Sequence, residues 1–122
     1  MSDETKSLRE AILSFNDYRE ELVTVPEWGG VQFLIRGMSG TARAEMLQRA
    51  VNPDTGEMEF GSLYPEVIIA SALDPFTHEP IFQAGDRGAL NSKSGGVLER
   101  LARTAMRLSG LDGQAEERLG KD

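Results

Sequence analysis

The sequence predicts an α+β fold, a helix-rich single domain with an N-terminal β-hairpin packed on three to four helices. The chain has 122 residues, enough for one domain that buries roughly two-thirds of its unfolded surface. Apolar residues recur with helical spacing in several segments, and one segment alternates around a turn as a hairpin does. We expect the domain at 7–111, between a disordered N-terminus at 1–6 and a mobile C-terminal tail at 112–122.

The first element is a helix expected from Ser7 to Leu22. Its apolar residues have the spacing of one face of an amphipathic helix; they are Leu8, Ala11, Ile12, Phe15 and Leu22. The last turn competes with a strand, because Asn16 and Asp17 favour turns and 22–25 is rich in branched side chains. The helical pattern is therefore clearest at its start.

A β-hairpin is expected from about Val23 to Arg36. In its second half, the apolar residues Val31, Phe33 and Ile35 alternate with residues that face the other side of the strand. Gly29 and Gly30 can adopt the positive φ angles that a tight turn requires. Pro26 cannot donate a hydrogen bond to a neighbouring strand, so the first strand is expected at a sheet edge or to be irregular.

Two segments in the middle of the chain carry capping residues. Ser39 is a candidate N-cap for a helix from about Thr41 to Val51, which the turn residues of 52–56 end. Asp86 is a candidate cap for a short helical turn through Leu90. Both segments are expected to be helical.

A buried helix is expected from Tyr64 to Leu73, because the segment is apolar nearly all round. A core strand is the alternative for 67–73, whose first residues are β-branched. We prefer the helix, because Pro65 suits a first helical turn and the alanines at 70 and 72 are poor strand residues.

The clearest element is a helix from about Ser94 to Ser109. One arc of it is apolar and comprises Val97, Leu98, Leu101, Ala105 and Leu108. A separate arc is basic and comprises Arg100, Arg103 and Arg107. Gly110 suits a left-handed stop to the helix, with Leu111 as its apolar contact.

Composition and motifs exclude several classes of protein. Twenty acids against 13 bases give a net charge of −7, which argues against nucleic-acid binding. No cysteine and a single histidine are present, so a zinc cluster or a cysteine nucleophile is excluded. The glycines match no phosphate-binding motif, and His78 lies in a turn between prolines. We expect a soluble, non-enzymatic protein without cofactor, metal or membrane span.

Charge and methionine give the candidate residues for contact with a partner. Seven acids and no base lie between Asp54 and Asp86, whereas four bases and one acid lie between Lys93 and Arg107. These are either two solvated faces or complementary surfaces for self-association or a partner, which makes Arg100, Arg103 and Arg107 candidates. Methionine adapts to varied partners or fills a core, and the methionines in question are Met38, Met46, Met58 and Met106.

Two sets of short motifs resemble a known family. The first set is Val25-Pro26-Glu27-Trp28-Gly29, then Arg36-Gly37-Met38-Ser39-Gly40 and Arg43. The second set is Leu73-Asp74-Pro75-Phe76-Thr77, Pro80-Ile81-Phe82 and Leu108-Ser109-Gly110-Leu111. Their order and spacing resemble the tail assembly chaperones of long-tailed bacteriophages or prophages, over about Leu8 to Leu111. The doubled glycine at 29–30 departs from the single glycine of that pattern and leaves the hairpin register open.

The resemblance implies a non-catalytic assembly factor of the host cytoplasm that is absent from the mature virion. Such a protein binds the tape-measure protein, keeps it soluble and hands it to the polymerising tail-tube protein, acting as a homo-oligomer. An alternative is another phage structural adaptor, such as a minor tail or head-tail connector protein. A further alternative is an acidic inhibitor of a host enzyme, against which the three arginines of the last helix count.

Overall fold

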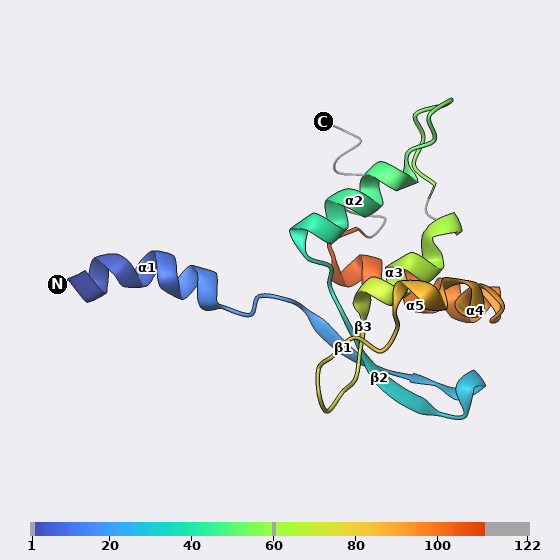
Figure 1. Ribbon diagram of the computed structural model, residues 1–122, viewed down its shortest axis with the longest axis horizontal. Coiled ribbons are helices and arrows are strands. Elements are labelled where there is room, and N and C mark those ends of the chain that lie inside the picture. Colours follow the sequence, from blue (N-terminus) through green and yellow to red (C-terminus); the bar gives the residue numbers. More distant parts are fainter. Residues whose placement is uncertain (1, 60, 112–122) are drawn as a thin grey trace.

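The computed structural model describes residues 2–59 and 61–111. Its helices and strands are α1 (Ser2–Ser14), β1 (Glu20–Val25), β2 (Val31–Arg36), α2 (Gly40–Ala50), α3 (Tyr64–Ser71), β3 (Ala72–Leu73), α4 (Arg87–Asn91) and α5 (Gly95–Leu108). Three short 3-10 turns accompany them, namely η1 (Pro26–Trp28), η2 (Gly61–Leu63) and η3 (Ala84–Asp86). The α+β prediction is confirmed, because α2, α3, α4 and α5 gather on one side of a small antiparallel sheet (Figure 1).

The N-terminal hairpin is confirmed, with its turn at the two glycines. β1 pairs with β2 along its whole length, in the register that sets Val25 opposite Val31. Gly29 and Gly30 have φ angles of 76° and 79°, so both positions favour glycine and the doubling belongs to the turn. The strand order β1-β2-β3 places β1 at the edge, as expected from Pro26.

The buried helix in the middle of the chain is confirmed, but it ends earlier than expected. α3 covers Tyr64–Ser71, and the next two residues form β3. Ala72 pairs with Ile35 and Leu73 with Leu34, so β3 adds a third strand beside β2. The free edge of β2 accounts for this change, because it offers hydrogen bonds that a longer helix would leave unmade.

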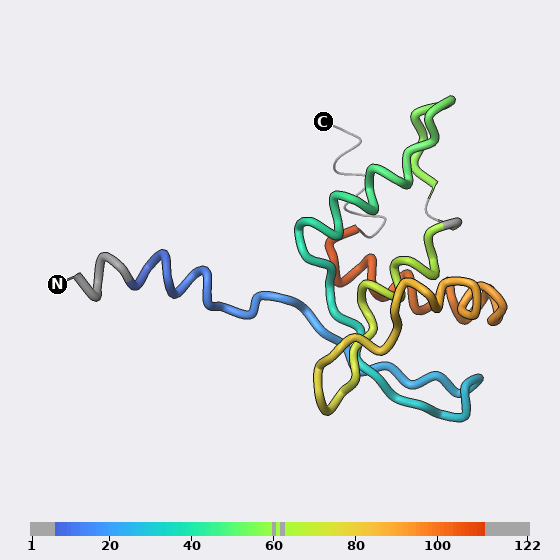
Figure 2. Tube along the Cα trace, viewed as in Figure 1, coloured from blue at the N-terminus to red at the C-terminus, as the bar shows by residue number. Residues whose placement is uncertain are grey.

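The first helix ends well before the expected position. The expected extension to Leu22 is wrong, because α1 stops at Ser14. The side chain of Asn16 then accepts a hydrogen bond of 3.2 Å from the backbone N–H of Tyr18. Leu22 lies in β1, where pairing with β2 replaces the helical turn. Figures 1 and 2 show α1 projecting from the body at the end of an extended segment.

The same helix begins before the boundary expected at residue 7. Residues 2–6 belong to α1, although we expected them to be disordered. The expected mobile tail at 112–122 lies outside the described residues. The division of the chain at residues 7 and 111 stays a prediction.

The core lies where α3, α5 and the inner face of the sheet meet. The apolar arc of α5 is buried as expected, and residues of the sheet and α3 complete the cluster, among them Val25, Phe33, Ile35, Val67 and Ile68. Gly110 has a φ angle of 79° after the last turn of α5. The backbone N–H of Leu111 donates a hydrogen bond of 2.7 Å to the carbonyl oxygen of Met106. This confirms the expected helix stop and its buried apolar contact.

Candidate protein-binding groove

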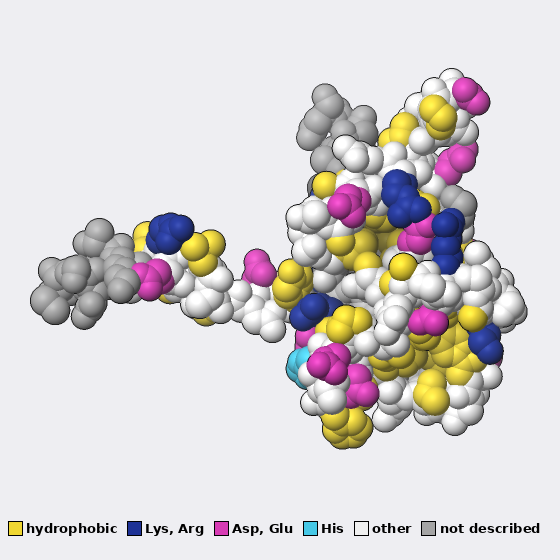
Figure 3. Space-filling model, viewed as in Figure 1, with side chains coloured by type: hydrophobic (Ala, Val, Ile, Leu, Met, Phe, Trp, Pro, Cys, Tyr) yellow, Lys and Arg dark blue, Asp and Glu magenta, His cyan; other side chains and the backbone are white. Residues whose placement is uncertain are grey.

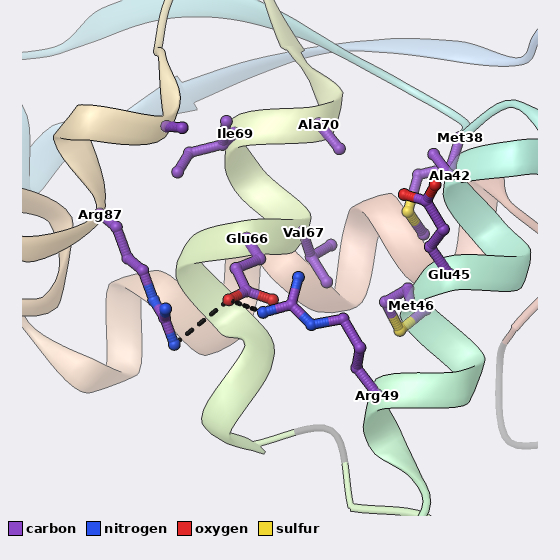
Figure 4. Close-up of a pocket in the computed structure, with 11 residues that line it drawn as sticks. Met38, Ala42, Glu45, Met46, Arg49, Glu66, Val67, Ile69, Ala70 and Arg87 are labelled. Carbon is purple, nitrogen blue, oxygen red and sulfur yellow. Dashed lines mark hydrogen bonds and ion pairs between the residues drawn. The ribbon is translucent and has the colours of Figure 1, made fainter.

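A groove opens between α2 and α3 and is bounded on a third side by η3 and the start of α4 (Figure 4). Its volume is about 360 Å³. Figure 3 shows apolar side chains in this hollow beside α2, with charged side chains around them. The lining residues are Met38, Ala42, Glu45, Met46, Arg49, Glu66, Val67, Ile69, Ala70, Ala84 and Arg87. An apolar floor with a charged rim is typical of a protein-binding surface.

The wall formed by α2 combines small and flexible side chains. Met38, just before α2, and Met46 on α2 are 8% and 6% exposed, and Ala42 lines the groove with them. The hydroxyl of Ser39 accepts a hydrogen bond of 3.1 Å from the backbone N–H of Ala42, which confirms the predicted N-cap. Alanine leaves space above the floor, and the thioethers of methionine adjust to what enters it.

The start of α2 is fixed to the end of α5. The backbone N–H of Met38 donates a hydrogen bond of 2.8 Å to the hydroxyl of Ser109. The Nε of Arg43 donates one of 3.0 Å to the carbonyl oxygen of the same serine. At Gly37 an added Cβ would lie 2.6 Å from the carbonyl oxygen of Leu108, so the two segments touch backbone to backbone. These contacts hold one wall of the groove.

The wall formed by α3 rises directly from the core. Val67 is 1% exposed and belongs to the buried cluster, whereas Ala70 is exposed at the groove surface. Ile69 is half-buried and lines the same wall. Because α3 packs against α5 and the sheet, this wall is rigid.

An ion-pair network crosses one end of the groove. The Oε1 of Glu66 on α3 accepts from the Nη2 of Arg49 on α2, and it lies 3.2 Å from the Nη2 of Arg87 on α4. The side chain of Glu66 is 16% exposed, whereas both arginines are about half exposed. Each exposed pair contributes little to the stability of the fold, on the order of 1 kcal/mol or less. Together they tie three helices at one end and leave the apolar floor open beyond it (Figure 4).

The predicted arginines of α5 lie outside this groove and bind carboxylates of their own chain. Arg100 donates two hydrogen bonds, of 2.8 and 3.0 Å, to Glu27 in the hairpin turn. Arg107 donates one of 2.7 Å to Glu21 on β1. Arg103 lies 3.4 Å from Glu99 on its own helix. The pairs of Arg100 and Arg107 hold the hairpin against α5, and a role of the three arginines in self-association stays a prediction.

The hydrogen bonds from Arg100 also shift the pKa of the carboxyl group that they reach. They lower the pKa of Glu27 from 4.5 to about 2, with a smaller lowering by its own backbone N–H. The pKa of Arg100 is raised by the same contact. Glu27 is therefore ionised throughout the physiological range.

The predicted methionines fall into three different places. Met38 and Met46 line the groove and also belong to the buried core cluster, so their role in binding stays a prediction. Met106 is 8% exposed in the core, and Met58 is 44% exposed in the loop after α2. Sequence reasoning missed Ala42 and Ala70, whose small size on facing helices is the only local signal of the groove.

The described part of the chain lacks two further features, a metal-binding cluster and a membrane-spanning helix. Within residues 2–59 and 61–111, no group of three or more His, Asp or Glu side chains is placed to hold a metal ion. The same part contains no helix long and apolar enough to cross a membrane. His78 is exposed in a turn, with a φ angle of 62°.

Comparison with known proteins decides the family. The family model described as phage tail assembly chaperone matches residues 7–121. This chain belongs to that family. The structure titled "Structure of bacteriophage HK97 tail assembly chaperone" is similar, with a TM-score of 0.57 and 28% sequence identity. The match covers 88% of this chain and 95% of that one. No curated protein sequence matches the chain.

In this member of the tail assembly chaperone family, the two sets of motifs that carried the resemblance meet in space. The segment 36–43 contacts the segment 108–111 through the hydrogen bonds at Ser109. Trp28 of the first set stacks on Phe33, with ring centres 6.4 Å apart. The motifs therefore hold the fold together around α5, and the groove lies beside them.

Proposed function

We propose that this tail assembly chaperone holds apolar helical segments of the tape-measure protein in the groove between α2 and α3. In this way it keeps the tape-measure protein soluble and promotes polymerisation of the tail-tube protein around it. The observation that supports this proposal is an open groove with an apolar, methionine-bearing floor and a charged rim, in a member of this family.

The dimensions of the groove favour a helix as its occupant. A cavity of about 150 Å³ accommodates a benzene ring, so 360 Å³ accommodates about two large apolar side chains. Two such side chains one turn apart on an amphipathic helix can enter together, which is the helix-in-groove mode of recognition. Met38 and Met46 adapt to different side chains, so successive segments of a long partner can use the same groove.

The expected affinity of a single groove is low. Full burial of two large apolar side chains contributes about 3–6 kcal/mol to the free energy of binding. The loss of conformational freedom in the partner offsets part of this gain. Many copies along one tape-measure protein therefore act together. The tail-tube protein can then displace them one by one.

This function places the protein in the cytoplasm of the bacterial host, as a homo-oligomer without cofactor or catalytic role. Its substrate is another protein, and its contribution is to cover apolar surface until assembly. We further propose that it leaves the structure before the virion is complete. Mass spectrometry of purified particles tests this point, since a minor tail or connector protein would be found there.

Co-expression with the tape-measure protein tests the groove. Ala70→Glu places a charge on the apolar wall, whereas Ala44→Glu places the same charge at an exposed position of α2 outside the lining. We expect the wild-type chain and Ala44→Glu to keep the tape-measure protein soluble, and Ala70→Glu to lose most of this effect. Equal solubility with both variants would contradict the proposal.

A further inference from the structure

The first helix presents an apolar face that the described residues of its own chain leave exposed. Leu8 and Ile12 on α1 and Phe15 directly after it share this face and are 70%, 60% and 72% exposed. In proteins, most of the stability of an amphipathic helix comes from packing of its apolar face. Among the described residues nothing covers this face of α1, so it is available to a partner.

The segment before β1 is fixed to the end of β2, and α1 extends from it. The carbonyl oxygen of Arg19 accepts a hydrogen bond of 2.9 Å from the backbone N–H of Gly37. The guanidinium of Arg36 lies 4.5 Å from the centre of the Tyr18 ring. These contacts hold the segment in line with β1, and α1 projects to one side of the body (Figures 1 and 2).

We propose that α1 of one copy lies in the groove between α2 and α3 of a second copy, so that copies associate head to tail. The lengths agree, because α1 has 13 residues and α2 has 11, or about 20 and 16 Å. The volumes agree as well, because the groove accepts about two large side chains. Leu8 and Ile12, one turn apart, are the two that α1 supplies.

Charges at the edges of the two surfaces are complementary. Arg9 follows Leu8 beside the apolar face of α1, and Glu45 lies at the groove. Both are exposed, and among the described residues neither forms an ion pair. Opposite charges that meet at the rim of a contact favour the correct register and faster association.

A head-to-tail contact leaves one groove and one α1 unused at the two ends of an assembly, so further copies can add. Insofar as the groove also binds the tape-measure protein, which rests on the proposed function, α1 and the tape-measure helix compete for it. Self-association then covers the groove until a tape-measure segment displaces α1.

Light scattering over a range of concentrations tests the contact with two substitutions in α1. Ile12→Glu places a charge on the apolar face, and Leu13→Glu, at a position 67% exposed on another face, is the control. We expect Ile12→Glu to weaken self-association by about tenfold or more and Leu13→Glu to leave it unchanged. The fluorescence of Trp28 verifies that both variants fold.

Mixing two variants distinguishes a head-to-tail contact from a symmetric one. Ala70→Glu blocks the groove and keeps α1, whereas Ile12→Glu keeps the groove and blocks α1. We expect each variant alone to be monomeric and the equimolar mixture to form a two-chain complex. Unaltered association of Ala70→Glu, a monomeric mixture, or a wild-type chain that stays monomeric would overturn the proposal.

The two proposals fail separately. If only the proposed function fails, Ala70→Glu loses self-association but still keeps the tape-measure protein soluble. If only the α1 contact fails, Ile12→Glu associates as the wild type does, while Ala70→Glu no longer keeps the tape-measure protein soluble.

Discussion

The Nε of Arg43 on α2 donates a hydrogen bond of 3.0 Å to the carbonyl oxygen of Ser109 at the end of α5. The hydroxyl of the same serine accepts from the backbone N–H of Met38. One residue at a helix end thus fixes the segment that leads from the hairpin into α2. Since α2 forms a wall of the groove, this junction determines where the groove lies.

Gly37→Ala is expected to destabilise the junction. Its Cβ would lie 2.6 Å from the carbonyl oxygen of Leu108, which is backbone and cannot swing away. Overpacking of this kind lowers the free energy of unfolding by about 1–3 kcal/mol. Gly40→Ala is the control, because nothing lies within 4 Å of its added Cβ. Urea unfolding followed by the fluorescence of Trp28 measures both, and equal stability of the two variants would contradict the packing described.

Ser109→Ala is expected to lower the free energy of unfolding by about 1–3 kcal/mol, because the backbone N–H of Met38 loses its partner in a part-buried site. Ser92→Ala is the matched control, since the Ser92 hydroxyl donates only to the carbonyl oxygen of Ala89 at an exposed position. The control is expected to change stability by less than about 0.5 kcal/mol. The same urea titration compares them, and a loss at Ser92 as large as that at Ser109 would count against the junction.

Two isoleucines distinguish the core from the exposed helix. Ile35→Ala removes a side chain that is 0% exposed. It is expected to lower the free energy of unfolding by about 2–5 kcal/mol. Ile12→Ala removes one that is 60% exposed and is expected to change stability by less than about 0.5 kcal/mol in dilute solution. Thermal unfolding at low concentration measures both. A large loss at Ile12 would show that α1 packs on the body of its own chain.

Acid is expected to weaken the contact between the hairpin and α5. The pKa of Glu27 is about 2 in the folded chain, against 4.5 for a free glutamate. A carboxylate with a lowered pKa adds stability above its unfolded value, and this stability is lost as the pH falls through the folded value. Between about pH 5 and pH 2, the free energy of unfolding of the wild type should therefore fall more steeply than that of Glu27→Gln.

Glu45→Gln is the control for this comparison, because Glu45 is exposed and forms no ion pair among the described residues. Its pH dependence should follow that of the wild type. Parallel curves for the wild type and Glu27→Gln would contradict the role of Arg100 at this site.

Much of the fold follows from local chemistry that a sequence displays. The glycines at 29 and 30, the cap at Ser39 and the apolar arc of α5 each act within a few residues, and the structure has all of them. β3 could not be predicted in this way, because two residues form a strand only where the edge of β2 is free.

The groove and the position of α1 depend on relations that no short segment contains. The pattern of Leu8 and Ile12 predicts an apolar helical face but not what covers it. The groove arises from the space that Ala42 and Ala70 leave between two helices, and that space depends on how α5 holds them. Arg100 was expected on a basic arc, and its bond to Glu27 requires the hairpin to fold against that arc.

The most direct test of the groove is methyl NMR of the methionines during titration with a soluble apolar helical peptide from the tape-measure protein. Met38 and Met46 line the groove, whereas Met58 lies outside it and serves as an internal control. We predict saturable shifts of the first two methyl signals and none at Met58. Binding that leaves the signals of Met38 and Met46 unchanged would contradict the proposed site.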